Sequence, residues 1–348
     1  MKLAIINDTH FGARNDSQLF LDQSFQFFEE QFFPYCLEHG ITKVLHLGDF
    51  LDRRKFVNFN TLSQVRARFI DKLKEHGIEV HCILGNHDTY YRNTNRINSI
   101  RELFSDMENF YLYEDPIELT FDSLTIAMIP WINKTNTEES IDFIKNSKAP
   151  IVAGHFELDG YEVLRGVKYE GGLNDKIFSR YDMVLSGHFH IKNSKNNVHY
   201  LGTQYQLTFS DLNVKKGFHT LDTETRELRF VENPNCMFHA ITYDENEDML
   251  NRDYSMYENS FVKVYVFEKN NPYLFDKFLD KLYDVKVSSL TIIEDMGSVI
   301  DDEVGVDVSK DTVAIMNDEI DTLTNVPDDQ KSRIKNLMRE LYMESLSL

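Results

Sequence analysis

The chain has 348 residues, of which 42% are hydrophobic and 27% charged, a composition typical of a globular protein rather than a disordered one. Its net charge of −20 argues against a broad basic face that binds a polyanion by charge alone. Its three cysteines lie far apart without a C-x-x-C motif, which argues against a disulfide framework. The apolar run at the N-terminus is too short for a signal peptide, and no run approaches transmembrane length, so we expect a cytoplasmic protein without a membrane partner.

Short apolar runs rich in β-branched residues predict the strands of the first part of the chain. They lie at 2–7, 42–47, 78–84, 124–130, 150–155 and 182–188. Helices are expected at about 17–39, 58–76 and 94–106. Alternation of strand and helix indicates parallel pairing through right-handed crossovers. From 110 to 230 the pattern becomes richer in strands, so we predict an α/β fold with two stacked mixed sheets flanked by helices.

The segment VENPNC at 231–236 indicates a domain boundary. A smaller unit follows, with a strand at 261–267, a helix at 272–284 and a strand at 288–294. An acidic stretch is expected to be a linker, and two helices at about 309–323 and 327–346 complete the chain, the second opening at a proline with aspartates in its first turn. The predicted domains are therefore 1–235, 236–297, a linker at 298–308, and 309–348.

Residues of the types that commonly bind metals follow most of the predicted strands, in the motifs NDTH, LGDFLD, LGNHD, AGHFE and SGHFH. Ligands collect at the carboxyl ends of strands in α/β sheets, and residues at i and i+2 of an extended chain point to one side. One such motif is a weak signal, but five in this order are specific. The candidate ligands are Asp8, His10, Asp49, Asn86, His155, His188 and His190. Mixed imidazole and carboxylate ligands suit Mn, Fe or Zn better than Mg or Ca.

These motifs resemble the signature of the calcineurin-like metallophosphoesterase superfamily, D-x-H, G-D-x-x-D, G-N-H-D/E, G-H and G-H-x-H. The resemblance implies a four-layer α/β/β/α fold and two divalent metals that activate a water. It places Asp8, His10, Asp49 and His190 on one metal, and Asp49, Asn86, His155 and His188 on the other. It also implies that His87 stabilises the transition state or protonates the leaving group, and that Asp88 orients His87. For Asp52 we expect a catalytic role in support of the ligands or on the substrate side, with the alternative that it only caps a turn.

The sequences at and around these motifs, GDFLDRRK, GNHDTYYRN and IPW, resemble those of the SbcD nuclease family and its branch in T-even phages. That implies a manganese-dependent DNA nuclease, a 3′→5′ exonuclease on duplex ends and an endonuclease on single strands, located in the host cytoplasm if phage-encoded. It implies work with an SbcC-type coiled-coil ATPase in DNA end processing, recombination and replication. The small unit would then be a DNA-capping domain, and the terminal helices would dock the ATPase. Archaeal and eukaryotic relatives carry histidine at the position of Asp52, whereas this branch carries aspartate.

The same resemblance implies a homodimer formed through the helices at 58–76 and 94–106. Candidate contacts are Leu62, Val65, Phe69, Ile97, Ile100 and Leu103. The alternative is that these side chains belong to the core beneath the sheet, and the sequence does not separate the two.

Basic residues near the second and third motifs are candidate contacts to DNA phosphates. They are Arg53, Arg54, Lys55 and Arg92, with Arg165 in a glycine-rich loop at 159–175. Tyr90 and Tyr91 could stack on a frayed base, although core packing is an alternative. Because the chain is acidic, weak and salt-sensitive DNA binding is expected.

Two other functions remain open. A nucleotide phosphodiesterase of the same superfamily would use the same metals but would need no C-terminal extension. A non-catalytic DNA-end scaffold for the ATPase would need neither His87 nor a complete ligand set.

Overall fold

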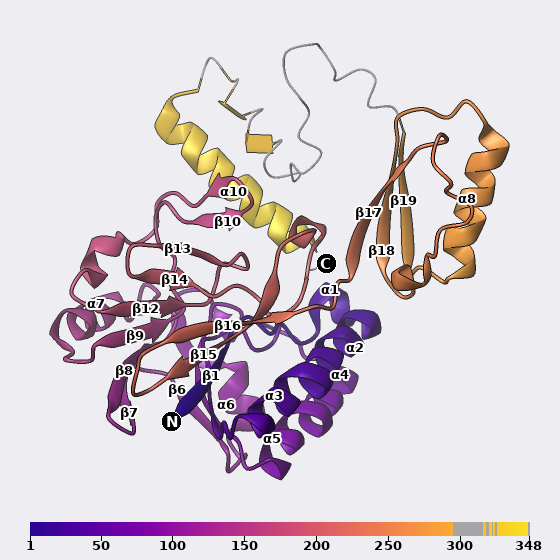
Figure 1. The fold of residues 1–348 in the computed structure, drawn as a ribbon. Helices are drawn as coiled ribbons and strands as arrows, with labels where there is room; N and C mark the ends of the chain where they lie inside the picture. Colours follow the sequence, from indigo (N-terminus) through magenta and orange to yellow (C-terminus); the bar gives the residue numbers. More distant parts are fainter. Residues whose placement is uncertain (295–315, 318–319, 322, 324–325, 347–348) are drawn as a thin grey trace. The chain divides into compact units, whose positions relative to one another are not determined.

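The computed structural model describes residues 1–294, 316–317, 320–321, 323 and 326–346 (Figure 1). These residues form two compact units. The large unit contains 1–207, 215–234 and the described residues from 316 onward, and the small unit contains 208–214 and 235–294. The linker predicted at 298–308 lies outside the described residues, as does most of the helix predicted at 309–323.

The first sheet of the large unit has the strand order β16-β15-β1-β2-β3-β6. Its strands are β1 (Lys2–Ile6), β2 (Lys43–His46), β3 (Glu79–Ile83), β6 (Phe110–Tyr113), β15 (Lys216–Asp222) and β16 (Leu228–Asn233). The strands β1, β2, β3 and β6 run parallel, while β15 and β16 add antiparallel partners beside β1. The predicted parallel half is therefore present.

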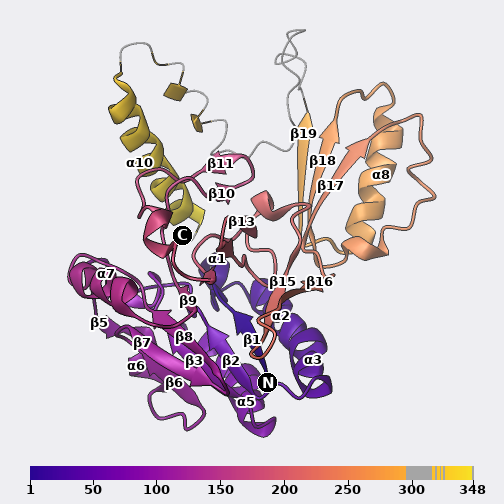
Figure 2. The same ribbon diagram turned by 60° about the vertical axis from the view of Figure 1, so that its left-hand side comes forward.

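Helices follow β1, β2 and β3 and cover one face of this sheet (Figures 1 and 2). They are α1 (Ala13–Asp16), α2 (Gln18–Phe27), α3 (Phe33–Glu38), α4 (Phe59–Val65), α5 (Asp71–Glu75) and α6 (Ser99–Phe104). Two π-helical turns, at Phe28–Phe32 and Arg66–Ile70, join α2 to α3 and α4 to α5. The helices predicted at 17–39 and 58–76 are confirmed.

The second sheet has the order β13-β14-β12-β9-β8-β7. Its strands are β7 (Ile117–Phe121), β8 (Leu124–Ile129), β9 (Ile151–Gly154), β12 (Met183–Ser186), β13 (Asn193–Lys195) and β14 (Val198–Tyr200). Helix α7 (Thr137–Asn146) and the 3₁₀ turn Asp175–Phe178 pack on its outer face. Two hairpins lie outside the sheets, β4 (Thr89–Tyr91) with β5 (Thr94–Asn98), and β10 (Glu162–Leu164) with β11 (Val167–Lys168).

The two sheets stack face to face because alternate residues of each strand point to opposite sides. On β1, Ala4 and Ile6 join the core beneath the helices, whereas Ile5 lies between the sheets. Opposite Ile5 in that layer are Met128 and Ile151 of the second sheet. The result is helix, sheet, sheet and helix in four layers, which confirms the predicted fold class.

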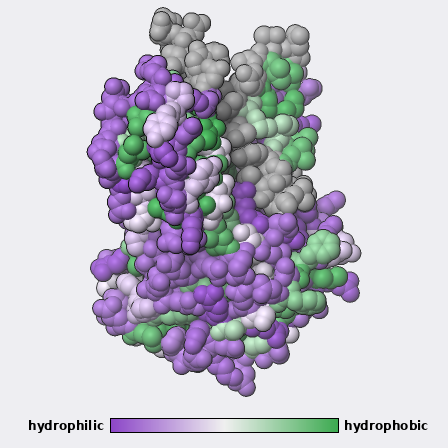
Figure 3. Space-filling view, turned by 90° about the vertical axis from the view of Figure 1, so that its right-hand side faces the viewer, coloured by the Kyte–Doolittle hydropathy of each residue, from purple (hydrophilic) through white to green (hydrophobic). Residues whose placement is uncertain are grey.

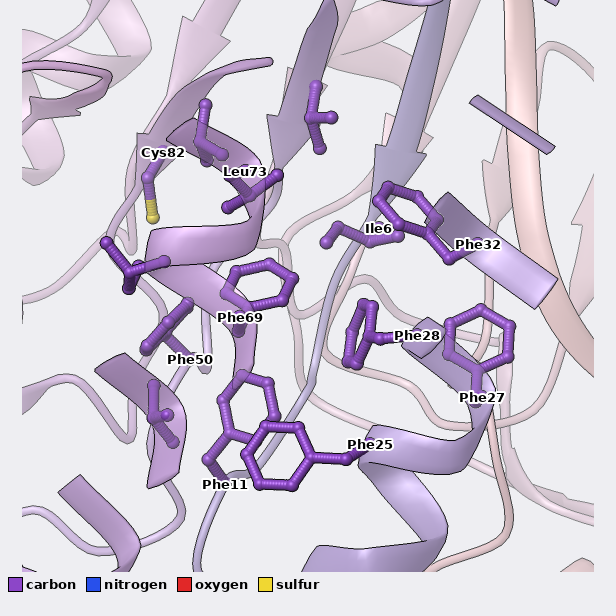
Figure 4. Packing of buried hydrophobic residues seen from close by; sticks show 14 of the residues in the cluster. Ile6, Phe11, Phe25, Phe27, Phe28, Phe32, Phe50, Phe69, Leu73 and Cys82 are labelled. Carbon is purple, nitrogen blue, oxygen red and sulfur yellow. The ribbon is translucent and has the colours of Figure 1, made fainter. Parts of the chain in front are cut away.

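Phenylalanine dominates the core between the first sheet and its helices (Figure 4). Phe28 packs edge-on against Phe69 at 4.7 Å between ring centroids, and Phe11 contacts Phe50 at 5.2 Å. Aromatic pairs at these distances add about 0.5–1.5 kcal/mol to the burial of their area. These rings lie directly beneath the loop that carries the first motif, so they hold that loop in place.

The small unit is a three-stranded parallel sheet with one helix. Its elements are β17 (Phe238–Tyr243), β18 (Phe261–Val266), β19 (Ser289–Glu294), α8 (Pro272–Asp284) and the 3₁₀ turns Phe209–Asp211 and Ser255–Tyr257. Asn271 caps α8 by accepting from the Leu274 amide at 3.2 Å, and Pro272 occupies its first turn. The prediction found α8 and the strands around it but missed β17, whose sequence FHAITY mixes polar and apolar residues.

The expectation for the third helix was wrong at its start, and burial decides between the two alternatives for several candidate dimer contacts. Residues 94–98 form β5 rather than helix, and α6 begins only after Asn98, whose side chain caps it by accepting from the Arg101 amide at 2.8 Å. Among the candidate dimer contacts, Val65, Phe69 and Ile100 are fully buried in the core of their own chain. They cannot reach a second copy.

The C-terminal helix predicted at 327–346 is present as α10 (Asp328–Leu346). Among the residues that the structure describes, no helix is long and apolar enough to cross a membrane. The face shown in Figure 3 is largely hydrophilic, with its hydrophobic residues in separate groups.

We predict that Phe69→Ala lowers the free energy of unfolding by about 3–5 kcal/mol, because its ring is fully buried among other rings. Leu37→Ala is the control, since its side chain is 54% exposed on α3 and its loss should change stability by less than about 0.5 kcal/mol. Urea denaturation measures both. Equal losses in the two variants would contradict this packing.

Candidate metal centre

The candidate ligands come together because five strands end at the same edge of the stacked sheets. Asp8 and His10 follow β1, Asp49 follows β2, and Asn86 follows β3 in the first sheet. His155 follows β9, and the pair at 188 and 190 follows β12, its parallel neighbour in the second sheet. All seven side chains meet in one place, although the sequence separates the first from the last by most of the large unit.

Three side chains form a first group. The Nε2 atoms of His10 and His190 lie 3.1 Å apart, and each lies 4.0 Å from Oδ1 of Asp8. Asp8 is also fixed from the second sheet, because its carboxylate accepts from the backbone N–H of His188 at 2.9 Å. Two imidazole nitrogens and a carboxylate oxygen at such distances enclose a volume suited to one cation.

A second group lies around Asn86. The side-chain Oδ1 of Asn86 is 3.0 Å from His155 Nε2 and 2.9 Å from His188 Nδ1. Asp49 connects the two groups, since its Oδ2 lies 3.3 Å from His155 Nε2 and 3.7 Å from His10 Nε2. Its other oxygen accepts from the backbone N–H of His87 at 2.7 Å. The shared oxygen is thus the one that faces both groups.

The amide of Asn86 tests whether this pocket fits a cation. With its oxygen inward, it faces lone pairs of two imidazoles and a carboxylate, an arrangement that only a positive charge between them makes favourable. Turned over, its nitrogen would donate to His155 and His188 and its oxygen would accept from Arg54 Nη2 at 3.1 Å. The amide is therefore satisfied without a cation only when its nitrogen points inward, whereas its inward oxygen suits a bound cation.

Neighbouring groups set the tautomers of the ligand histidines. His155 Nδ1 donates to the main-chain oxygen of Leu47 at 2.8 Å, which leaves its Nε2 as the acceptor for a metal. Asp52 Oδ1 lies 3.2 Å from Nδ1 of His10 and orients it in the same way. His188 is reversed, because its Nε2 lies 3.3 Å from Glu157 Oε1 and its Nδ1 faces Asn86.

Nearby carboxylates favour positive charge in this pocket. Burial lowers the pKa of His10, but the ion pair with Asp52 and the charges of Asp49 and Asp8 outweigh it and raise that pKa to about 9. Burial likewise lowers the pKa of His155, and Asp49 then raises it to about 9. A metal would compete with these protons, so its binding would release them.

The backbone that presents the ligands is strained. Asp8, Asp49 and His188 have φ angles of 49°, 56° and 81°, a left-handed conformation that costs residues other than glycine of order 1–3 kcal/mol each. At Gly85 a Cβ would lie 2.2 Å from Asp49 Oδ1, so only glycine lets the loops after β2 and β3 approach this closely. Such strain is typical of functional sites.

Comparison with known proteins agrees with this geometry. Residues 1–192, more than half of the chain, match the model of the family described as calcineurin-like phosphoesterase. The chain belongs to that family. It is therefore a metal-dependent phosphoesterase, and the residues just described are its candidate metal ligands.

Sequence similarity to individual proteins extends beyond residues 1–192. This calcineurin-like phosphoesterase is 30% identical over 347 residues to "Exonuclease subunit 1" of Enterobacteria phage T4, covering 99% of each chain. It is 25% identical over 262 residues to the SbcD component of the SbcCD nuclease of Staphylococcus epidermidis, covering 66% of this chain and 67% of the other. Among solved structures, an archaeal phosphodiesterase matches 67% of this chain and all of its own, with 16% identity and a TM-score of 0.34.

Asp88 has a different role from the one that we predicted. Its buried carboxylate accepts from the backbone amides of Asp49 and Gly85, each at 2.8 Å, and of Phe50 at 2.9 Å. The Nδ1 of His87 instead faces the main-chain oxygen of Asp52. Asp88 thus joins the loops after β2 and β3, and the backbone of Asp52 orients His87.

His87 lies at the open side of the phosphoesterase site. It is only partly buried, unlike Asp49 and Asp88, and its ring packs edge-on against His10 at 4.8 Å between centroids. Because Nδ1 is engaged, Nε2 remains to exchange a proton with a substrate. A ring nitrogen of His87 also lies within 4.8 Å of ligand atoms of His10 and Asp49, so His87 belongs to the same cluster as the candidate ligands.

The predicted DNA contacts lie in different surroundings. Arg53 forms an ion pair with Asp16 at 3.4 Å, so it fastens the loop after β1. Arg54 lies beside Asn86, and Lys55 lies over the Tyr90 ring at 5.7 Å from its centroid. Arg92 and Arg165 lie at the exposed turns of the β4–β5 and β10–β11 hairpins.

Sequence reasoning missed two groups that support the site. Glu157 contacts the ligand His188, and its only signal was its place two residues after His155 in GHFE. Lys216 is buried on β15, and its Nζ donates to the main-chain oxygen of His190 at 2.8 Å. Nothing in the sequence connects that lysine to the fifth motif.

We predict that Gly85→Ala weakens Mn²⁺ binding at least about tenfold, because the new Cβ displaces the shared carboxylate of Asp49. Gly40→Ala is the control: its φ of 62° makes alanine cost about 1–2 kcal/mol of stability, yet nothing lies near its Cβ. Calorimetric titration with Mn²⁺ measures both. Similar affinity in the two variants would contradict the role of Gly85.

Proposed function

We propose that this calcineurin-like phosphoesterase is a DNA nuclease subunit that hydrolyses phosphodiester bonds with two Mn²⁺ ions. It acts as a 3′→5′ exonuclease on duplex ends and an endonuclease on single strands, in DNA end processing, recombination and replication. The observation that carries the proposal is the convergence of all seven candidate ligands at one edge, with His87 beside them. The full-length likeness to a protein named as an exonuclease subunit supports the choice of substrate.

The residues divide into two ligand sets that share one carboxylate. The first set is Asp8, His10, Asp49 and His190, and the second is Asp49, Asn86, His155 and His188. Mixed imidazole and oxygen donors favour manganese over magnesium. When bound, two such ions acidify a water and stabilise the charge that develops on the phosphate.

His87 acts on the leaving group in this proposal. The Asp52 carbonyl holds its Nδ1 proton and fixes the ring, so that Nε2 faces the open side of the site. Burial lowers the pKa of His87 more than the surrounding acids raise it, so Nε2 carries no proton in the free protein. The negative charge of a bound DNA phosphate would raise this pKa and favour the protonated ring that a general acid needs. Proton transfer by a positioned histidine is worth about 10²–10⁴-fold in rate.

DNA binding rests on a few groups near the metals. Arg54 beside Asn86 is placed to contact a phosphate held there. Tyr91 is 51% exposed and packs edge-on against Tyr90, so an aromatic surface is available for a base. With a net charge of −20 the chain alone is expected to bind DNA weakly.

A partner protein of the SbcC type, a coiled-coil ATPase, is the second part of the proposal. Helix α10 contacts the large unit through polar side chains and leaves Leu337 and Leu341 exposed, at 56% and 51%. Leucines four residues apart lie on one helix face, which suits insertion into another helical surface. The predicted capping role of 236–297 and docking role of 309–348 belong to this same proposal.

A homodimer remains part of the proposal, with Ile97 kept from the first candidates and two exposed phenylalanines added. Phe56, in the loop before α4, and Phe59, its first residue, are 72% and 87% exposed, and Ile97 is 44% exposed. Large exposed apolar side chains near one another in sequence favour an interface with another protein surface.

We predict that His87→Ser lowers the cleavage rate of an end-labelled duplex in Mn²⁺ by about 10²–10⁴-fold while Mn²⁺ affinity stays unchanged. His39→Ser, at an exposed histidine at the end of α3, should cut like the wild type. The labelled products also report the polarity. Hydrolysis of small phosphodiesters but not DNA would favour a nucleotide phosphodiesterase, and no hydrolysis with the ATPase supplied would favour a scaffold.

We predict that Leu337→Glu combined with Leu341→Glu weakens binding to the ATPase at least about tenfold, because two charges then face an apolar surface. Leu37→Glu, on the exposed side of α3, is the control and should bind normally. Analytical ultracentrifugation of the two proteins mixed together measures both. Unchanged assembly by the double variant would move the docking surface away from α10.

A further inference from the structure

Helix α10 packs on the loop that connects two of the metal motifs. Ser332 Oγ donates to Glu170 Oε2 at 3.0 Å, and Asn336 Nδ2 donates to the main-chain oxygen of Glu170 at 3.1 Å. One turn further, the guanidinium of Arg339 lies 4.4 Å from the centroid of the Tyr169 ring. Figures 1 and 2 both show α10 alongside the β10–β11 hairpin.

The loop at 157–173 is a closed unit rather than a loose connection. Its two ends are joined by the Leu173 amide, which donates to the Glu157 carbonyl at 2.8 Å. Inside it, Tyr169 and Tyr161 pair through their backbones, also at 2.8 Å. These hydrogen bonds connect Tyr169, which contacts α10, to Glu157 at the base of the loop.

Tyr169 and Glu157 connect this loop to the metal centre. Burial and the nearby Glu157 carboxylate raise the pKa of Tyr169, and the Tyr169 ring packs on Phe189 at 5.6 Å between centroids. Glu157 accepts from Nε2 of His188, whose Nδ1 faces Asn86. Contacts thus run from Arg339 through Tyr169 and Glu157 to His188, a candidate ligand of the second metal.

We propose that Glu157 is a positioning residue for His188 and that Arg339 completes its network, so that α10 docking and binding of the second metal reinforce each other. The inference rests on the proposed metal centre. Glu157 fixes the one ligand histidine that presents Nδ1, and a carboxylate behind an imidazole makes it a better ligand. Coupling between two sites is reciprocal, so the metal should also tighten α10 on the loop.

This coupling gives the C-terminal helix a second task. The polar face of α10 contacts the loop, while Leu337 and Leu341 are exposed. A partner that binds Leu337 and Leu341 without displacing Arg339 would leave the second metal site intact. A partner that detaches α10 from the loop would weaken metal binding at the second site.

Mn²⁺ titration of the full-length protein, followed by electron paramagnetic resonance, tests the positioning role. Glu157→Ala should weaken one of the two sites about 10–100-fold and leave the other unchanged. Glu157→Gln, which still accepts a hydrogen bond, should restore most of that loss. Two sites of wild-type affinity in Glu157→Ala would overturn the inference alone, whereas no Mn²⁺ binding by the wild type would overturn the metal centre too.

Hydrogen exchange tests the coupling without relying on activity. In the wild type, Mn²⁺ should slow exchange of α10 amides, and the slowing should disappear in Glu157→Ala or Arg339→Ala. Arg333→Ala is the matched control, on the same helix but exposed, and should retain it. Exchange of α10 that ignores Mn²⁺ in the wild type would overturn the coupling.

Discussion

The buried carboxylate of Asp88 is the interaction on which the rest of the site depends. It accepts from backbone amides of the loops after β2 and β3, and so holds Asp49 and Gly85 against each other. Burial and the charge of Asp49 raise its pKa to about 7, while the backbone amides act in the opposite direction. The three donors offset only part of the cost of removing this carboxylate from water, since its pKa remains raised. Without this clamp the shared carboxylate would have no fixed position between the two groups of ligands.

The core beneath this clamp explains why strain is tolerated at the ligands. Left-handed backbone at Asp8, Asp49 and His188 has to be maintained by its surroundings. Packed phenylalanine rings lie under the loop after β1, and the apolar layer between the sheets fixes the strand ends. The same acidic pocket that would repel a bare phosphate becomes suited to one once cations are bound.

The site extends further from the metals than its ligands suggest. Asp52 orients His10, Glu157 orients His188, and Lys216 holds the backbone at His190. Through Tyr169 and Arg339, the network reaches a helix close to the C-terminal end. In the proposed complex, the helix that offers leucines to a partner is therefore in contact with the support of one metal ligand.

The sequence by itself determined the class of fold, the candidate ligands and the helices of strong periodicity. Those features depend on local spacing, such as histidines at i and i+2 after a strand or apolar residues at helical intervals. Only the tertiary structure decided the partners of side chains that are distant along the chain. Asp88 binds main-chain amides rather than His87, Val65 faces the core rather than another copy, and Glu157 meets His188. Backbone amides carry no sequence signal, and burial depends on which layer covers a residue, so these contacts exist only once the sheets have stacked.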